Sequence, residues 1–495
     1  MSLFPALCAS QRTLWFHNRP VKSISSNSIK LLLLCRSRVS PLSFCAQQHP
    51  ALFYYFVCLF PYFHHLNLSK EQFLLPSLPN LLTMLKNLNC FIGLVALFFA
   101  CNSTQNGNGS TTDPRDTTGS NPPVEKREPN TNYQPAFEGQ TRIGGITTTT
   151  PYETTVLTEN LDRPWGITSL PDGRLLITQK SGTMRIATTA GQLGAPITGI
   201  PTVNAGGQGG LLGLTLDPAF NNNRMVYWAF TEDVSGGNLT AVAKGRLSND
   251  EKRIENATVI YRATPAYSNN MHYGGRVVFG GDGHLFVSTG ERSDLATRPQ
   301  AQQLSSGLGK VMRITTGGQP APGNPTFNEA GARPEIYSYG HRNPQGLAIH
   351  PVTGDLWLSE MGPRGGDELN LIKPGRNYGW AAITYGIEYG GEKISGGATQ
   401  KEGMEQPVYY WDPVLSPSGM TFYSGDAMAE WKNNIFICGL NSNHIARLRI
   451  ENNKVTGEER LLANERQRFR DITQGKDGAL YAVTDAGRLY RIAKK

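Results

Sequence analysis

The stretch that decides the fold is Pro171-Asp-Gly-Arg-Leu-Leu-Ile-Thr178, a tight polar turn followed at once by an alternating strand. Similar units begin at Gly281, Thr353 and Lys476, with a weaker copy at Lys432. Asp-Gly tolerates the positive φ of a tight hairpin turn, and the apolar alternation gives the strand one buried face. Because no long segment with a helical period competes, the sequence predicts an all-β fold.

The repeated unit also predicts how the strands are organised. Repeated antiparallel sheets favour a β-propeller, because radial repetition shortens the exposed edges. Blades run to about 40–50 residues before loop insertions. Because the loops here are long, six blades fit better than eight, and we expect a six-bladed β-propeller of four-stranded antiparallel sheets over residues 151–495. In a closed ring, the first copy (165–186) should lie beside the last (469–492).

Charge and cysteine content distinguish the first hundred residues from the rest. The formal net charge is +8, but residues 1–100 contain eight Lys and Arg side chains and a single acid, Glu71. The remainder is nearly neutral and lacks the clustered basic face that nucleic-acid binding needs, so we expect no nucleic-acid partner. Six of the seven cysteines lie at or before Cys101. We expect the seventh, Cys438, to be a small buried strand residue.

The N-terminal region has the features of an export signal. Residues 84–101 combine a charged start at Lys86, an apolar run and an Ala100-Cys101 end that resembles a bacterial lipoprotein cleavage site. An ordinary signal peptide cut nearby is the alternative. Residues 1–83 are interpreted as a spurious extension or a leader, and the polar residues 102–150 as a flexible linker. We expect a periplasmic or cell-envelope lipoprotein of a bacterium, attached to the membrane only through a lipid anchor.

One stretch joins several groups that could form a site. It begins with Arg342-Asn343 and continues, after a predicted hairpin, with Gly362-Pro363 and then Asp367-Glu368. The hairpin can place these groups at one end of a sheet. Because carboxylates and backbone carbonyls are hard oxygen donors, the stretch predicts a site for an anionic ligand and Ca²⁺. No Cys/His cluster indicates zinc.

Two further residues are candidates for chemistry. His272 lies in a loop that contains glycines, before the predicted strand 277–279, where it could act as a general base. Considered alone, such a residue is more often a plain surface histidine. Gln208 lies between glycines that allow the backbone to approach a ligand, although the segment could equally be an ordinary inter-blade loop.

Several motifs together resemble the glucose/sorbosone dehydrogenase family, which consists of soluble, PQQ-dependent aldose sugar dehydrogenases on a six-bladed propeller. The resemblance covers residues 152–495. The motifs are Gly206-Gly-Gln-Gly-Gly-Leu-Leu-Gly, Gly340-His-Arg-Asn-Pro-Gln-Gly-Leu-Ala, Glu360-Met-Gly-Pro-Arg-Gly-Gly-Asp-Glu-Leu-Asn, Gly375-Arg-Asn-Tyr-Gly-Trp and Arg468-Phe-Arg-Asp.

The resemblance implies an activity and three catalytic residues. The C1 hydroxyl of an aldose would be oxidised to the lactone with hydride transfer to PQQ, assisted by calcium. His272 matches the general base, Glu291 the carboxylate that orients it, and Arg342 the cation that stabilises the developing oxyanion. An external electron acceptor, either a cytochrome or a quinone, would regenerate the cofactor.

The resemblance also implies binding residues, with two departures. Gln208, Arg342, Asn343, Arg468 and Arg470 match PQQ contacts. The backbone of Gly362 and Pro363 matches the ligands of the PQQ-bound Ca²⁺, and Glu368 with Tyr378 matches a second, structural Ca²⁺ site. Met271 stands where glucose-active members have an Asp, which puts glucose in doubt as the substrate. Asn441 stands where a cofactor-binding Lys is expected.

Two alternatives remain open at the level of the sequence. The first is a non-catalytic extracellular binding propeller, since a fold does not determine a function. The second is a calcium-dependent lactonase. The lactonase would need several side-chain carboxylate and amide ligands converging on the central channel, whereas the cofactor-site ligands suggested here are backbone carbonyls.

Overall fold

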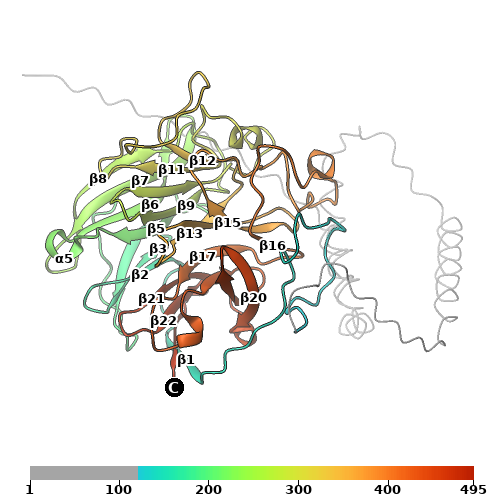
Figure 1. The fold of residues 1–495 in the computed structure, drawn as a ribbon. Coiled ribbons are helices and arrows are strands. Elements are labelled where there is room, and N and C mark those ends of the chain that lie inside the picture. Colours follow the sequence, from blue (N-terminus) through green and yellow to red (C-terminus); the bar gives the residue numbers. More distant parts are fainter. Residues whose placement is uncertain (1–120) are drawn as a thin grey trace, which may run out of the picture. The chain divides into compact units, whose positions relative to one another are not determined.

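The computed structural model describes residues 121–495, in which six antiparallel β-sheets surround a central axis (Figure 1). Each sheet is one blade of a propeller. Five blades have four strands and one has three, so the predicted fold is confirmed. In the three-stranded blade, Ile197 bridges to Met184 on the outer strand and lies where a fourth strand would run.

The strands follow the chain from blade to blade. Blade 1 contains β2 (Pro164–Ser169), β3 (Leu175–Gln179) and β4 (Thr183–Ala187). Blade 2 contains β5 (Leu211–Leu216), β6 (Met225–Val234), β7 (Gly237–Leu247) and β8 (Ile254–Arg262). Blade 3 contains β9 (Gly274–Phe279), β10 (Leu285–Thr289), β11 (Lys310–Ile314) and β12 (Ile336–Tyr339).

Blades 4 to 6 complete the ring. Blade 4 contains β13 (Pro344–Ile349), β14 (Leu356–Glu360), β15 (Asp367–Ile372) and β16 (Tyr409–Trp411). Blade 5 contains β17 (Pro417–Phe422), β18 (Ile435–Gly439), β19 (Ile445–Glu451) and β20 (Lys454–Leu461). Blade 6 contains β21 (Phe469–Gln474), β22 (Leu480–Thr484), β23 (Leu489–Lys494) and β1 (Tyr152–Thr158). The short helices are α5 (Phe220–Asn223), η2 (Arg298–Ala301), η3 (Ile394–Gly397), η4 (Ala429–Trp431) and η5 (Ala463–Glu465).

Two sets of contacts close the ring. The first strand, β1, pairs antiparallel with β23, so the C-terminus lies beside β1 (Figure 1). The innermost strands β2, β5, β9, β13, β17 and β21 each contact the next, and β2 contacts β21. The first and last copies of the repeated unit are therefore neighbours, as the sequence predicted. Pairing the first strand with the last blade leaves no open seam between the ends of the ring.

The core lies between the blades. On the second strand of each blade, neighbouring side chains point into different hydrophobic clusters. In blade 1, Leu176 packs in a cluster with Trp228 of blade 2, whereas Ile177 packs in a cluster with Tyr481 of blade 6. The sequence predicted one buried face for these strands, and this was wrong, because each sheet is covered on both faces by its neighbours. The prediction for Cys438 is confirmed, since it is fully buried in β18.

A β-bulge recurs near the start of the innermost strand of every blade. In blade 4 the register shifts between Pro344 and Gly346, and in blade 6 between Phe469 and Asp471. The residues at these shifts, Gln345 and Arg470, line the cavity at the mouth of the channel. Because a bulge re-aims side chains locally, the repeated irregularity supplies polar groups at one mouth of the channel.

Residues 121–150 differ from the flexible linker that the sequence predicted. The Glu125 carboxylate binds Arg127 (2.6 Å) and Arg460 (2.7 Å). Asn130 donates to Asp412 (2.8 Å). Ile143 is buried in the cluster between blades 4 and 5. Individual side chains thus anchor a polar segment that composition alone marks as unstructured. We call residues 121–150 the N-terminal arm.

The other N-terminal predictions lie outside the described residues. These are the extension 1–83, the signal segment 84–101 with its cleavage at Cys101, and the part of the linker before residue 121. In the part of the chain that the structure describes, no helix is both long and apolar enough to cross a membrane.

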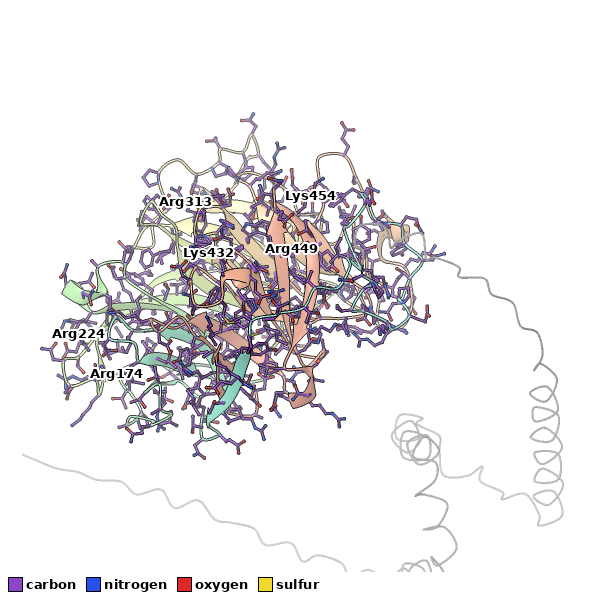
Figure 2. The ribbon with its side chains drawn as sticks, turned by 60° about the horizontal axis from the view of Figure 1, so that its bottom comes forward. Arg174, Arg224, Arg313, Lys432, Arg449 and Lys454 are labelled. Atoms are coloured by element: carbon purple, nitrogen blue, oxygen red, sulfur yellow. The ribbon has the colours of Figure 1, made fainter. Side chains whose placement is uncertain are left out.

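Basic side chains on the outer surface are mostly matched by carboxylates. Figure 2 labels six of them, distributed over several blades. Arg174 and Arg224 share Glu251, at 2.6 and 3.3 Å. Arg313 pairs with Asp282. This pairing leaves little local excess of charge on that surface, in contrast to the cavity described next.

Candidate active site

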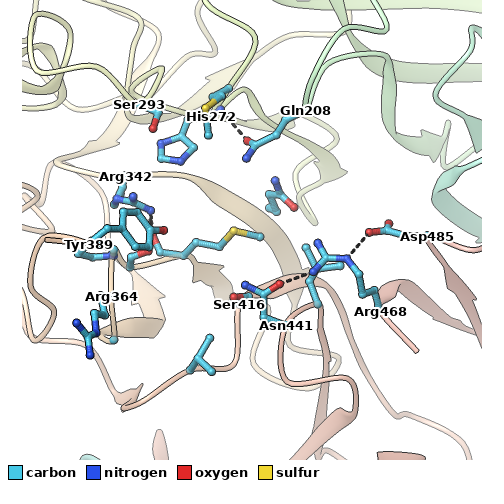
Figure 3. A pocket seen from close by; sticks show the side chains of 18 of the residues that line it. Gln208, His272, Ser293, Arg342, Arg364, Tyr389, Ser416, Asn441, Arg468 and Asp485 are labelled. Carbon is cyan, nitrogen blue, oxygen red and sulfur yellow. Dashed lines mark hydrogen bonds and ion pairs between the residues drawn. The ribbon is translucent and has the colours of Figure 1, made fainter. Parts of the chain in front are cut away.

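A cavity of about 580 Å³ opens at one mouth of the central channel (Figure 3). Loops and strand ends from all parts of the ring contribute to its walls. The charged residues that line it are Lys180, Arg342, Arg364, Arg468, Arg470 and Asp485. Five ordinarily cationic side chains thus face one carboxylate. Such an excess of positive charge in a concave site favours an anionic ligand.

His272 projects into this cavity from the loop before β9 (Figure 3). Its backbone has a φ of 47°, and its N–H donates to Gln208 Oε1 (2.8 Å). Its Nδ1 lies 2.6 Å from Glu291 Oε1. Since an ionised carboxylate only accepts hydrogen bonds, Nδ1 carries the proton and Nε2 is left with a lone pair. Within the described chain, no residue hydrogen-bonds Nε2.

The surroundings keep His272 neutral. Burial and, to a smaller extent, the nearby Arg342 lower the pKa of His272 to about 4, although the neighbouring Glu291 acts in the opposite direction. Only 4% of the residue is exposed. The imidazole is therefore unprotonated near pH 7 and can accept a proton at Nε2.

Glu291 lies behind His272, outside the cavity lining. Its Oε1 also accepts the backbone N–H of Ser293 (2.9 Å), and its own N–H donates to the carbonyl of Arg342 (2.9 Å). These contacts fix the carboxylate relative to both cavity residues. Glu291 thus contacts the ring nitrogen of His272 through which it could hold one tautomer, the role that the family resemblance implies.

Arg342 forms the wall next to His272. Its backbone N–H donates to Glu360 (2.6 Å), and its Nη1 donates to the carbonyls of Met361 (3.1 Å) and Gly362 (2.6 Å). The buried Nε has no partner within the described chain. A guanidinium with an unused N–H at a cavity wall is suited to bind a ligand oxygen.

Asn343, the predicted neighbouring contact, is placed differently. It is fully buried and is absent from the cavity lining. Its Oδ1 accepts the N–H of Gly274 (3.1 Å), which ties blade 4 to the start of β9. The structure therefore gives Asn343 a supporting place behind the cavity wall.

The wall opposite contains two arginines on one carboxylate. Arg468 Nε donates to Asp485 Oδ2 (2.9 Å), and Arg470 Nε donates to Asp485 Oδ1 (2.8 Å). Arg468 also donates to Asn441, as Figure 3 shows. The pair of arginines was predicted from sequence. Asp485, which orients them, was not.

Gly362 and Pro363 line the same cavity beside Arg342. Asp367 holds this turn, because its Oδ1 accepts the Gly362 N–H (2.9 Å). Its Oδ2 accepts the N–H groups of Leu415 (2.8 Å) and Ser416 (2.7 Å). The Gly362 carbonyl accepts an N–H from Arg342 (2.6 Å), and its second lone pair remains for a cation. The turn fits a hard cation held through backbone carbonyls.

Glu368 and Tyr378 border a separate small space of about 10 Å³, next to Glu360. Burial and the neighbouring Glu360 raise the pKa of Glu368 well above its usual range. Asn370 Nδ2 donates to both carboxylates, at 3.1 and 3.3 Å. The Tyr378 hydroxyl is occupied by Leu371 and Lys373, so only its backbone carbonyl could act as a ligand. Two close carboxylates in such a space fit a bound cation.

Other cavity residues carried little signal in the sequence. Trp165 and Gln345 reach it only because of the bulges, and Lys180 only because β3 ends at its edge. Asn130 reaches it from the N-terminal arm. Met271 and Asn441, the two departures noted above, both line it. Within the described residues, no group of three His, Cys, Asp or Glu side chains could hold a metal.

Comparisons with known proteins place this arrangement among sugar dehydrogenases. The model of the Glucose / Sorbosone dehydrogenase family matches residues 161–491. The chain is similar to aldose sugar dehydrogenase YliI of Escherichia coli (strain K12), with 41% identity over 345 residues, covering 69% of this chain and 92% of that protein.

Two solved structures are similar over the same region. The apo-form of the soluble aldose sugar dehydrogenase from Escherichia coli is 40% identical with a TM-score of 0.67, covering 70% of this chain and 100% of that one. The PQQ-bound form of aldose sugar dehydrogenase from Streptomyces coelicolor is 29% identical with a TM-score of 0.58, covering 70% and 99%.

Proposed function

Because the chain belongs to the glucose/sorbosone dehydrogenase family, we propose that it oxidises the C1 hydroxyl of an aldose to the lactone, with PQQ and calcium as cofactors. The observation that carries this proposal is the neutral His272, whose Nε2 faces a strongly cationic cavity beside Arg342. A general base next to an anion site is what sugar oxidation by an anionic quinone requires.

The cavity residues fit the cofactor. PQQ is a planar tricarboxylate, and the lining residues supply five cations against one carboxylate. Arginine suits such a ligand, because its planar fork binds carboxylates bidentately. In this proposal, Arg468 and Arg470 hold carboxylates on one wall, and Gln208 and Arg342 bind on the other. Asn343 supports Arg342 through the adjacent backbone.

The reaction needs a proton and a hydride to leave the sugar in concert. His272 Nε2 takes the proton from the C1 hydroxyl, and Glu291 stabilises the imidazolium that results. Arg342 places positive charge beside the developing oxyanion. When bound, PQQ with Ca²⁺ supplies the acceptor for the hydride from C1. The aldose thus loses a hydride, which carries both electrons, and one proton, which leaves to solvent through His272, and it becomes a lactone.

We assign two calcium sites to this chain. The carbonyls of Gly362 and Pro363 would hold the ion at the cofactor, and Asp367 would keep their turn rigid. Glu368 with the carbonyl of Tyr378 would hold a structural ion. Backbone carbonyls and carboxylates are the oxygen ligands that Ca²⁺ accepts at variable coordination number.

A PQQ titration of the purified protein in excess Ca²⁺ tests the proposal. Quenching of the fluorescence of Trp165 and its neighbours should report saturable binding. The loaded protein should then reduce an electron-accepting dye when aldoses are added, and His272→Gln should retain PQQ but lose turnover. A protein that binds no PQQ would contradict the proposal. Capture of a protein or glycan partner would then favour the binding propeller, and lactone hydrolysis without PQQ would favour the lactonase.

Export and lipid attachment are also part of the proposal. They rest on the apolar segment before Cys101 and on the polar residues that follow it. Expressed in a bacterium, the chain should lose its first hundred residues and carry a lipid on Cys101, which mass spectrometry of the mature protein measures. A mature chain that begins elsewhere and carries no lipid would indicate an ordinary signal peptide.

A further inference from the structure

Lys180 is a cavity residue that neither the motifs nor the predicted mechanism uses. It is the first residue after β3, and it lines the cavity next to the loop that contains Gln208. Its ammonium donates one hydrogen bond, to the carbonyl of Gly207 (2.7 Å). An ammonium has three N–H donors, so within the part of the chain that the structure describes two of them remain for a ligand.

The backbone of Lys180 is held on both sides, which fixes where the side chain starts. Its N–H donates to the backbone carbonyl of Arg163 (3.1 Å), and its carbonyl accepts the backbone N–H of Leu211 (3.2 Å). Gly210 approaches so closely that a Cβ there would lie 2.5 Å from the Lys180 carbonyl oxygen. When a ligand binds, a side chain on a fixed backbone loses less conformational entropy than the same side chain on a mobile loop would.

The charges around Lys180 are incompletely balanced. Arg468 and Arg470 share the single carboxylate of Asp485, which leaves one positive charge on that wall. Lys180 interacts electrostatically with Arg470 and Asp485, and its ammonium adds a second positive charge. Burial and the repulsion from Arg470 lower the pKa of Lys180, and an anion bound there would relieve that repulsion. Asn441, which accepts a hydrogen bond from Arg468 and also lines the cavity, is a neutral amide and adds no charge.

We propose that Lys180 is a binding residue for a carboxylate of the anionic cofactor, and that it completes a three-cation wall with Arg468 and Arg470. The inference rests on the proposed function, since it concerns the same ligand. Two excess positive charges on one wall match two carboxylates on one edge of a planar polyacid. In this chain the cofactor-binding lysine is therefore Lys180, at the end of a strand in blade 1, and not a residue of the blade 5 loop that contains Asn441.

The test compares variants by equilibrium PQQ titration in excess Ca²⁺. Lys180→Gln keeps an N–H donor for the Gly207 carbonyl but removes the charge, so the dissociation constant should rise about tenfold. Lys180→Arg restores the charge and should stay within about threefold of wild type. Lys244→Gln is the matched control, because Lys244 also donates to a backbone carbonyl, that of Thr316 (2.8 Å), away from the cavity.

A second readout separates charge from local structure. The dissociation constant of the wild-type protein should rise with added NaCl, and that of Lys180→Gln should rise less steeply, because one ion pair is missing. A purely structural role would weaken binding without changing this slope. Unchanged PQQ affinity in Lys180→Gln overturns the assignment alone. Absence of PQQ binding in wild type and in Lys244→Gln overturns the proposed function and the assignment together.

Discussion

At the scale of single residues, His272 shows how burial sets the working range of a base. Its pKa of about 4 means that Nε2 stays available down to mildly acidic pH. We therefore expect kcat/KM to fall on the acid side with a midpoint near pH 4, well below the usual histidine value of about 6.5. A midpoint near 6.5 in the pH profile of the loaded enzyme would contradict this reading.

Glu291 permits a sharper prediction, because it raises the pKa of His272 against burial. In Glu291→Gln, the acid midpoint should move below that of wild type, while kcat drops by about 10²-fold since the imidazolium loses its counter-charge. PQQ affinity should not change, because Glu291 lies outside the cavity lining. The matched control is His284→Gln, a substitution at a turn histidine beside Asp282. A midpoint that moves upward would show that the carboxylate does not act through His272.

The low pKa of His272 also makes the free energy of unfolding depend on pH. In the unfolded chain His272 takes up a proton at about pH 6.5, whereas in the folded chain it does so only near pH 4. Between these values the unfolded state binds more protons, so the contribution of His272 to the free energy of unfolding decreases as the pH falls.

Glu368 allows the structural calcium site to be tested by itself. Its carboxylate lies close to Glu360, and burial and that neighbour raise its pKa. Bound Ca²⁺ would remove this repulsion and raise the melting temperature through linkage. In Glu368→Gln, we expect the Ca²⁺-dependent rise in melting temperature to be lost, measured by thermal denaturation with and without chelator. A rise as large as that of wild type would assign the stabilisation to another site.

The sequence identified cavity residues that lie in motifs and missed Lys180, which does not. His272, Arg342, Arg468 and Arg470 were predicted because they lie in distinctive motifs, and all four line the cavity together with Gln208. Lys180 follows an ordinary strand, and nothing in its neighbours marks it. It becomes a site residue only because ring closure, through the contact of β2 with β21, places it in one cavity with Arg468 and Arg470. Asn343 shows the reverse case, where a motif residue lies behind the wall.

At the scale of elements, the repeated turns predicted the strands well but the N-terminal arm poorly. A turn followed by alternating apolar residues is a local signal, so β3, β10, β14 and β22 could be read directly. The arm has no such signal. Its order depends on single contacts with residues far along the chain, such as Thr148 with Glu459 (2.7 Å). Local composition cannot reveal partners of that kind.

The arm also reaches the cavity, which gives it an expected effect on the substrate. Asn130 Oδ1 accepts from Arg364 Nε (3.0 Å), and both residues line the cavity. Asn130→Ala frees Arg364, so we expect the KM for aldoses to rise several-fold, with little change in kcat or PQQ affinity. Steady-state kinetics with saturating PQQ measure this, and Asn132→Ala in the same arm is the control. An equal fall in kcat with unchanged KM would assign Asn130 to the chemistry instead.

At the scale of the whole molecule, one buried ion pair joins blades across the central channel. Arg276 of β9 donates to Asp471 of β21 (2.7 Å) and to the Gln345 carbonyl of β13 (2.9 Å). Asp471 also accepts the Ile167 N–H of β2 (2.9 Å). The Arg276–Asp471 ion pair and its hydrogen bonds thus connect the innermost strands of four blades. It borders a second cavity, of about 350 Å³, in the channel formed by the innermost strands.

This pair predicts a large, conditional loss of stability. Arg276→Met leaves the Asp471 carboxylate buried without its counter-charge, which should cost about 3–5 kcal/mol of unfolding free energy. Adding Asp471→Asn removes that charge and keeps an acceptor for the Ile167 N–H, so the double variant should recover most of the lost unfolding free energy.

Because burial raises the pKa of Asp471, the single variant Arg276→Met should also regain stability as the pH falls and the carboxylate takes up a proton. Urea denaturation at several pH values measures both effects. A double variant as unstable as Arg276→Met would show that Arg276 acts by filling space over Trp165, where its guanidinium lies 4.5 Å from the ring centre, rather than by joining the blades through charge.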